Sequence, residues 1–447
     1  MKNFYKKSEF YVSAAGLIVL AAIFVCWLKN NLSIGAPGLI AAFLSVCLFA
    51  ALCLRFVPLW MDSWRKTSAE EARIGGESQS ICPQIFVSLL MVNAVTILVV
   101  YLVRLIMGES ANFMESLDFW RCTDSAHYLD IARDGYLSQG SVDRLVQLVF
   151  LPGYPLAVRL VNLAVGNYLV SGLLVSALSF AGAGCVIYRL LCLDYSHGTA
   201  LRTIKYFCIL PGAFFFTAPM SESLFLLLCA ACIYLFRRER PIAACLCGGL
   251  AAFTRSTGLA LLVPLIMEIV SQAVGWKQSG IIKKSAALVL IPAGFAAYCY
   301  INYRVSGDPF KFMEYQSEHW GQHFGWFFNT AAYQTQNAIS SFTQSPHNFW
   351  GLWLPNLIAC FGALMAMLAS VKKMRPGYTA WFIAYFIVAI GATWLLSAPR
   401  YLISLIPVPL ALSIISENPK TGKILTLTCA CASILYLLAF INRWQVW

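Results

Sequence analysis

The feature that most constrains this chain is a series of apolar runs, each about as long as a bilayer is thick. The runs 11–28, 39–57 and 85–107 each hold 18 residues or more with at most one charge. A helix needs about 20 mostly apolar residues to cross the hydrocarbon core. Only 12% of the chain is charged, whereas soluble domains carry roughly a quarter. We therefore predict an all-α, polytopic transmembrane helical bundle.

Further apolar runs raise the expected number of spans to about 11 to 13. The run 149–165, broken by two prolines, is expected to lie along the interface or to re-enter. The run 242–270 carries Arg255 at its centre, and a charge in mid-bilayer is costly. Two short half-helices that meet at the outer side would avoid that cost. The remaining runs lie near 168–190, 204–218, 221–236, 281–303, 350–371, 379–397, 401–416 and 424–441.

Basic residues give the predicted orientation. The net charge of +12 is interpreted as positive loops that face anionic lipid, and not as a nucleic-acid surface. Both long polar loops, 108–148 and 304–349, then fall on the non-cytoplasmic side, where they can build one site over the mouth of the bundle. The residues placed in the cytoplasm are Arg65, Lys66, Arg73, Arg237, Arg238, Arg240, Lys277, Lys283, Lys284, Lys372, Lys373, Arg375, Lys420 and Lys423.

The first candidate site lies in the first of these loops. Asp124, His127 and Tyr128 are three and four residues apart, so on a helix they share one face. A carboxylate beside a histidine near low-dielectric surroundings can act as a general base. The alternative is a solvated helix face in a loop that holds seven acids.

Three more ionisable residues stand within or beside apolar runs, where they are expensive and hence functional candidates. Glu222 could be a first-turn carboxylate of a helix or could orient a substrate hydroxyl. Arg255 and Arg400 could each bind a phosphate through two hydrogen bonds, or could be arginines that snorkel to the interface.

The second loop is rich in aromatic and polar residues. His319 and His323 have the spacing of two metal ligands on a helix, but there is no HExxH motif and no acid at the complementary spacing. No metal and no other cofactor is expected. Aromatic residues near histidine and glutamine, such as Trp320, more often form a sugar-stacking or interfacial surface than a metal site. The chain has no P-loop, dinucleotide fingerprint or GxSxG motif, which points to lipid-linked donors instead of nucleotides.

Six strings in order carry a resemblance to a known family. They are TDSAHYLDIARDGY, FLPGYPL, FFFTAPMSESLF, AFTRSTGLALLVP, GDPFKFMEYQSEHWG and RYLISLIPVPLAL. Over roughly residues 100–415 the chain resembles the GPI mannosyltransferase II (PIG-V-like) family of multispanning GT-C glycosyltransferases, which has bacterial relatives. The chain departs from the family pattern at Thr123, where the family has tryptophan.

The resemblance implies transfer of a sugar, expected to be mannose, from a polyprenyl-phosphate carrier to a hydroxyl of a lipid, glycan or protein acceptor. It implies Asp124 as the general base of an inverting reaction. Arg255 or Arg400 would stabilise the leaving phosphate. The expected location is a bacterial plasma membrane in preference to the endoplasmic reticulum. The other substrate-binding candidates are His127, Tyr128, Tyr136, Glu222, His319 and Trp320.

The resemblance also suggests a division of the chain. Residues 1–60 form a two-span extension, 61–415 a GT-C-like catalytic membrane domain, and 416–447 a C-terminal span. Two alternatives remain open. A transporter or flippase of lipid-linked saccharide would keep its polar residues near the bilayer midplane, and a polysaccharide ligase or polymerase would depend on histidine and arginine of the second loop.

Overall fold

The computed structural model describes residues 2–63, 81–110, 112–136, 146–274 and 280–447. Within these ranges the chain is helical, and its one isolated β-bridge joins Phe324 to Ala392. The all-α prediction is therefore confirmed. Basic residues Arg65, Lys66, Arg73 and Lys277 lie outside the described residues.

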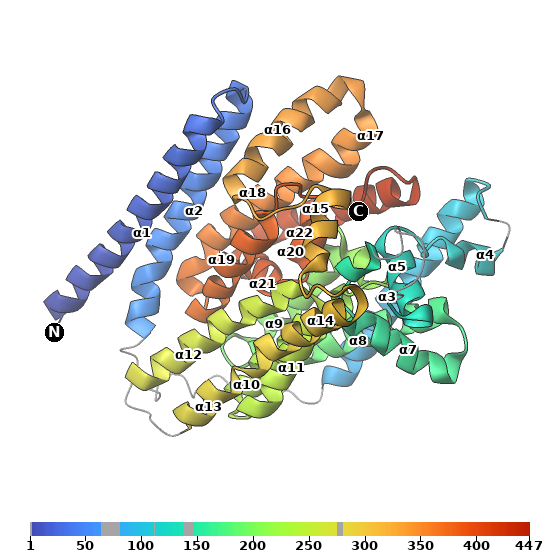
Figure 1. Ribbon diagram of the computed structural model, residues 1–447, viewed down its shortest axis with the longest axis horizontal. Helices are drawn as coiled ribbons and strands as arrows, with labels where there is room; N and C mark the ends of the chain where they lie inside the picture. Colours follow the sequence, from blue (N-terminus) through green and yellow to red (C-terminus); the bar gives the residue numbers. More distant parts are fainter. Residues whose placement is uncertain (1, 64–80, 111, 137–145, 275–279) are drawn as a thin grey trace.

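The described helices can be followed along the chain in Figure 1. In chain order they are α1 (Lys2–Asn30), α2 (Ala36–Ser63), α3 (Cys82–Ile106), α4 (Phe113–Asp118), α5 (Asp124–Asp134), η3 (Val146–Val149), α7 (Gly153–Val165), α8 (Tyr168–Leu191), α9 (His197–Ile209), η4 (Ala213–Phe216), α10 (Glu222–Arg237), α11 (Pro241–Thr254), η5 (Ser256–Leu261), α12 (Leu262–Val274), α13 (Ile281–Ala287), α14 (Leu290–Ser306), α15 (Lys311–Trp320), α16 (Phe327–Gln344), α17 (Pro346–Asn348), η6 (Phe349–Trp353), α18 (Leu354–Ser370), η7 (Val371–Lys373), α19 (Pro376–Ile390), α20 (Ala398–Ile403), α21 (Pro407–Ile415) and α22 (Pro419–Ile441).

Eight helical segments in the described residues are long and apolar enough to cross a membrane. The described residues also contain three shorter apolar helices, α7, α11 and α19. The eight segments contain α1, α2, α3, α8, η5 with α12, α13 with α14, α17 to η7, and α22. The chain is thus an integral, multi-pass membrane protein.

The basic loops come together at one end of the bundle. Asp194, after α8, pairs with Arg237 at the end of α10 and with Arg375 before α19, the latter at 3.1 Å. Arg375 also pairs with Glu268 of α12 at 2.8 Å. Two further pairs tie the neighbouring turns, Lys284–Glu239 at 2.7 Å and Lys373–Glu417 at 2.6 Å. The described basic loops therefore share one face, as the positive-inside pattern predicts.

The opposite end carries the polar residues that were predicted to be functional. Helix α10 begins at Glu222 and ends at Arg237, which lie about 22 Å apart at 1.5 Å per residue. Helix α11 returns from Pro241 and ends at Thr254, so that Arg255 lies at the same end as Glu222. After Arg255 the chain turns into η5 and α12. Two helical segments therefore meet at Arg255 as predicted, although η5 with α12 is long enough to cross a membrane and is not a short half-helix.

Helix α7 stays at this same end. A Cβ on Gly153, its first residue, would come within 2.2 Å of Thr254, so α7 starts against the end of α11. Arg159 of α7 donates to the carbonyl of Ala132 in α5 at 2.6 Å. Leu160 and Leu163 are 68% and 83% exposed. This arrangement agrees with the prediction of a helix along the interface.

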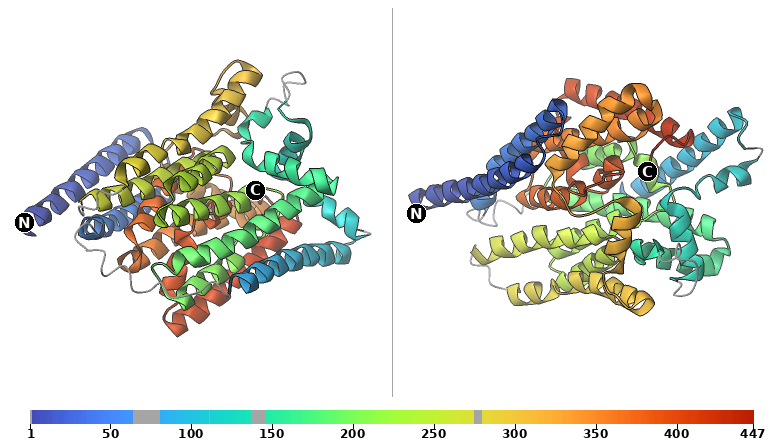
Figure 2. Two further views of the ribbon diagram at one scale, coloured as in Figure 1. Left: turned by 90° about the horizontal axis from the view of Figure 1, so that it is seen from below. Right: turned by 45° about the horizontal axis from the view of Figure 1, so that its top comes forward.

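The region 304–349 is more helical than a polar loop would be. Helix α16 lies beside the pair α1 and α2, which run along one edge of the molecule in Figures 1 and 2. Trp27 of α1 donates to Asn329 of α16 at 3.0 Å, and the rings of Phe49 and Phe327 are 4.6 Å apart. The second polar region therefore contains helices α15 and α16, and α16 is not among the described helices that are apolar enough to cross a membrane.

Two predicted spans have different bounds in the structure. The run 379–397 is helical only to Ile390, and the run 401–416 is divided into α20 and α21. A Cβ on Gly391 would come within 2.2 Å of the Ile387 carbonyl and 2.8 Å of the Gly325 carbonyl. This close backbone approach favours the end of α19 at that position.

Candidate functional site

Asp124 is the first residue of α5, and the backbone before it is strained. Thr123 has φ 50° and ψ −132°, a conformation that favours glycine. Such a conformation costs about 1–3 kcal/mol and needs support from its surroundings. The Asp124 side chain is 30% exposed, so the carboxylate remains accessible.

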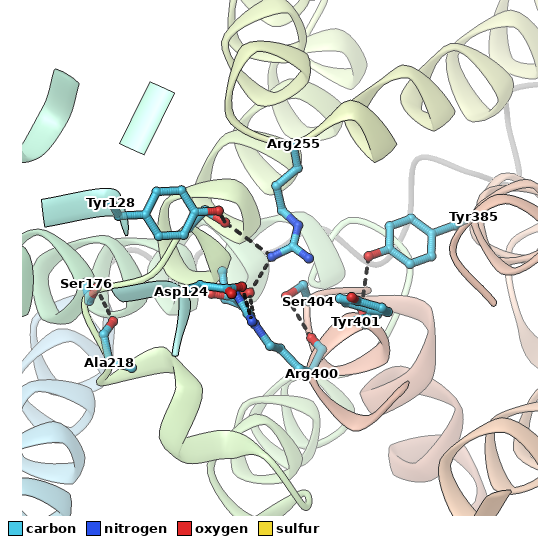
Figure 3. Close-up of polar contacts among 11 residues, drawn as sticks. Asp124, Tyr128, Ser176, Ala218, Arg255, Tyr385, Arg400, Tyr401 and Ser404 are labelled. Carbon is cyan, nitrogen blue, oxygen red and sulfur yellow. Dashed lines mark hydrogen bonds and ion pairs between the residues drawn. The ribbon is translucent and has the colours of Figure 1, made fainter. Parts of the chain in front are cut away.

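One guanidinium group connects Asp124 to a second carboxylate. Arg400 donates from Nη1 to Asp124 Oδ2 at 2.5 Å and from Nε to Glu222 Oε1 at 2.5 Å. The Arg400 side chain is only 5% exposed. Figure 3 shows Asp124, Arg255 and Arg400 pointing toward one another from separate elements. We call Asp124, Glu222, Arg255 and Arg400 the ion cluster.

Glu222 is fully buried, and its two oxygens differ in their partners. Oε1 accepts from Arg255 Nη1 and from Arg400 Nε. Oε2 has no hydrogen-bond partner among the described residues. A buried acceptor without a donor is costly, which suggests that a hydroxyl group or water fills this place.

The turn before Glu222 is held by hydrogen bonds from α8 and α10. Ser176 donates to the carbonyl of Ala218 at 2.7 Å (Figure 3), and Ser223 donates to that of Phe216 at 2.8 Å. These contacts fix the start of α10. Glu222 is therefore presented at the helix N-terminus, where the peptide dipoles favour a negative charge.

Tyr128 faces the ion cluster from α5. Its hydroxyl lies 3.1 Å from Ser221 Oγ, which also accepts from Arg255 Nη1 at 3.2 Å. Burial raises the pKa of Tyr128 to about 12. The hydroxyl therefore stays protonated near neutral pH and can act as a hydrogen-bond donor.

His127 lies away from the ion cluster, on an aromatic surface. Its ring stacks on Phe150 with centroids 4.6 Å apart and planes at 17°. The structure gives no hydrogen bond between His127 and Asp124 in the part of the chain it describes. The hydroxyl of Tyr136 donates to the Phe150 carbonyl. Both residues therefore support Phe150, and a role in substrate binding stays a prediction.

The two outer regions meet at this aromatic surface. Trp320 of α15 contacts Phe150 edge to face at 6.0 Å, and Tyr315 packs with Leu148. His319 is exposed and lies beside Trp320, with ring centroids 6.0 Å apart. Figure 2 also shows α15 near α5. The expectation that the two regions share one side is confirmed, although the ring contacts of His319 and Trp320 within the described residues do not reach the ion cluster.

The described residues show no metal cluster, and a cavity within the bundle lies away from the ion cluster. Within the described ranges, no three His, Cys, Asp or Glu residues are placed to hold a metal ion. A cavity of about 150 Å³ lies among α3, α8, α9, η4 and α22. None of the four ion-cluster residues lines that cavity, so it is a separate feature.

Several residues near the ion cluster could not be singled out from the sequence. Ser221 bridges Tyr128 and Arg255, and Tyr385 donates to the carbonyl of Tyr401 at 3.0 Å (Figure 3). Asn356 donates to the Leu395 carbonyl and accepts from the amide of Ala398. Hydroxyl and amide groups are common in apolar helices, so no signal in the sequence pointed to these residues.

The comparisons agree with the family that the motifs indicated. A family model described as Mannosyltransferase (PIG-V) matches residues 104–274. This segment includes Asp124, Glu222 and Arg255 and ends before Arg400. The resemblance is confirmed over this part of the chain, and with it the expectation of a membrane glycosyltransferase. No curated protein matches the sequence.

Three solved structures resemble the chain. One is ArnT from Cupriavidus metallidurans bound to undecaprenyl phosphate, at 14% identity and TM-score 0.45, covering 79% of this chain and 75% of that one. A second is the Archaeoglobus fulgidus oligosaccharyltransferase in complex with Zn and sulfate, at 15% identity and TM-score 0.39, covering 74% and 49%. A third is the archaeal oligosaccharyltransferase AglB from Archaeoglobus fulgidus with dolichol-phosphate and an inhibitory peptide, at 14% identity and TM-score 0.38, covering 73% and 51%.

Proposed function

We propose that the protein transfers mannose from a polyprenyl-phosphate carrier to an acceptor hydroxyl on the non-cytoplasmic side of a bacterial plasma membrane. The observation that carries the proposal is the accessible Asp124 carboxylate joined through Arg400 to the buried Glu222. The ion cluster lies at the end of the bundle opposite the basic loops. That position suits a donor whose lipid tail stays in the membrane.

Asp124 is the general base. As the acceptor oxygen attacks the anomeric carbon, its proton passes to the Asp124 carboxylate and a new carbon–oxygen bond forms. The bond from that carbon to the phosphate oxygen breaks, and the lipid phosphate leaves with the electron pair. Attack from the face opposite the leaving group inverts the anomeric configuration. Help of this kind typically contributes about 10²–10⁴-fold in rate.

The two arginines have different tasks. Arg400 uses two of its nitrogens to hold the carboxylates of Asp124 and Glu222. Arg255 uses only Nη1 in the hydrogen bonds of the described structure, and its side chain is 14% exposed. Arg255 therefore has donors left to bind the leaving phosphate through two hydrogen bonds.

Glu222 gives the site a means of recognising the sugar. Its Oε2 atom is buried and has no donor in the described structure. A hydroxyl of the transferred sugar would satisfy this oxygen. A site built around a buried acceptor discriminates strongly against a sugar that lacks the matching hydroxyl.

The direct test uses purified protein, polyprenyl-phosphate mannose with labelled sugar, and a membrane lipid extract. Asp124→Asn should lower turnover about 10²–10⁴-fold while the protein keeps its thermal midpoint. Asp118→Asn is the matched control, because Asp118 lies in the same outer region and is exposed. Unchanged turnover in Asp124→Asn would remove the assignment of the base, and absence of any labelled product with wild-type protein would remove the proposed reaction.

A further inference from the structure

We propose that Asn356, together with Gln334, is a positioning residue that holds Arg400 in place to engage Asp124. Asn356 is in α18 and Gln334 in α16, and both are only 1% exposed. Neither touches the ion cluster. Their catalytic effect rests on the proposed function, but their effect on the backbone around Arg400 does not.

Helix α20 depends on Asn356 for its N-terminal cap. The helix has six residues, with Arg400 as the third. Ser397, at the cap position, makes no side-chain cap, and its hydroxyl has no partner among the described residues. Instead, Asn356 Oδ1 accepts from the amide of Ala398 at 2.8 Å. A cap typically contributes about 1 kcal/mol to the stability of a helix. This is a large part of the stability of so short a helix.

The segment before α20 is held by side chains of α16 and α18. Both the carbonyl and the amide of Leu395 hydrogen-bond to side chains. Its carbonyl accepts from Gln334 Nε2 at 2.8 Å and from Asn356 Nδ2 at 3.1 Å, and its amide donates to the hydroxyl of Tyr333 at 2.5 Å. Thr330 also donates to the carbonyls of Ile390 and Ala392, at 2.8 and 3.2 Å.

These contacts fix the backbone from which Arg400 reaches the carboxylates. Asn356 Nδ2 also lies 3.3 Å from Gln334 Oε1, so the two amides form one unit. Arg400 must satisfy two carboxylates at once, and a guanidinium group does so only in a narrow range of positions. A displacement of 1 Å in such a site can cost about 100-fold in rate. Asn356 and Gln334 therefore act on Asp124 through Arg400.

Hydrogen exchange measures the backbone effect without reference to activity. In detergent or nanodiscs, Asn356→Leu should speed exchange in a peptide covering 396–404 at least 10-fold. Asn356→Asp keeps the acceptor for Ala398 but loses the donor to the Leu395 carbonyl, so it should restore only part of the protection. The control is Asn93→Leu, since Asn93 is another buried asparagine in a span and, among the described residues, its side chain hydrogen-bonds only to Leu89 of its own helix. Equal exchange at 396–404 in wild type and Asn356→Leu would overturn the proposal.

A double-mutant comparison separates positioning from general stability. Asn356→Leu should lower kcat roughly 10- to 100-fold and change the KM for the lipid donor less than about 3-fold. In an Arg400→Lys background the same substitution should lower kcat less than about 3-fold, because residues that act through one another are not additive. Equal losses in both backgrounds would overturn the proposal. If Asn356→Leu does not fold, Gln334→Leu takes its place in both measurements. Faster exchange without activity in the wild type would instead refute only the proposed function.

Discussion

Arg400 donates to Asp124 at 2.5 Å although the two residues are 276 positions apart in sequence. The same guanidinium group reaches Glu222, 178 positions away. Three outer segments of the chain therefore meet at one side chain. Because each contact is short and charge-assisted, the position of Arg400 determines the position of both carboxylates.

Replacing each arginine by lysine should separate their tasks. Lysine keeps the charge but cannot bridge two carboxylates as a planar fork does. We expect Arg400→Lys to lower kcat roughly 10- to 100-fold with little change in donor KM. Arg255→Lys should mainly raise the donor KM, since a bidentate phosphate contact is lost. Steady-state kinetics with varied polyprenyl-phosphate mannose measures both, and an identical pattern in the two variants would contradict the division.

Glu222→Gln should destabilise the protein. Glu222 is fully buried and pairs with two arginines, so removing its charge leaves the two guanidinium groups with only the carboxylate of Asp124. Breaking a buried pair in this way costs about 3–5 kcal/mol. The free energy of unfolding in detergent, or the thermal midpoint, measures the loss. Glu314→Gln is the control: its partner is Lys311 and its side chain is 48% exposed, so the change should stay within about 1 kcal/mol.

Tyr128→Phe should leave the shape of the pH profile unchanged. Burial raises the pKa of Tyr128 to about 12. A tyrosine with a raised pKa stays neutral below that value, so it does not titrate between about pH 5 and 9. We expect a modest loss of activity from the missing contact to Ser221. The profile of kcat/KM against pH is the measurement, and the disappearance of one limb would identify Tyr128 as the group that titrates.

Gly294→Ala should disturb the helix that presents Arg255. A Cβ at this position of α14 would come within 1.9 Å of the Gly249 carbonyl in α11. Overpacking of this kind costs about 1–3 kcal/mol, and it should lower both the thermal midpoint and the activity. Gly362→Ala in α18 meets nothing within 4 Å and serves as the control. Equal behaviour of the two variants would show that the α11–α14 contact is dispensable.

The sequence led to the ion cluster because ionisable residues in apolar surroundings are rare. That rule singled out Asp124, Glu222, Arg255 and Arg400, and the structure brings all four together. The same rule does not single out amide side chains, because they are not ionisable. Asn356 matters through its contact with a backbone 42 residues away, which no periodicity can reveal.

Boundaries also followed tertiary contacts more than composition. The apolar run 379–397 suggested one continuous span. The backbone of its last part is not helical and instead hydrogen-bonds to the side chains of Thr330, Tyr333 and Gln334. The region 304–349 looked like a loop because it is polar overall. Its aromatic residues at 326–328 nevertheless begin helix α16, which packs beside α1 and α2. The average composition of a run therefore does not reveal where such tertiary contacts end a helix.

The shared oxygen of Glu222 has a consequence for how an anionic substrate enters. Two guanidinium groups and two carboxylates cancel formally, so the ion cluster is neutral and does not act as a vacant positive pocket. An incoming phosphate therefore meets a formally neutral cluster and binds through the remaining donors of Arg255, so long-range attraction contributes little to its capture. Added salt, which weakens distant attraction far more than buried contacts, should therefore leave donor affinity nearly unchanged.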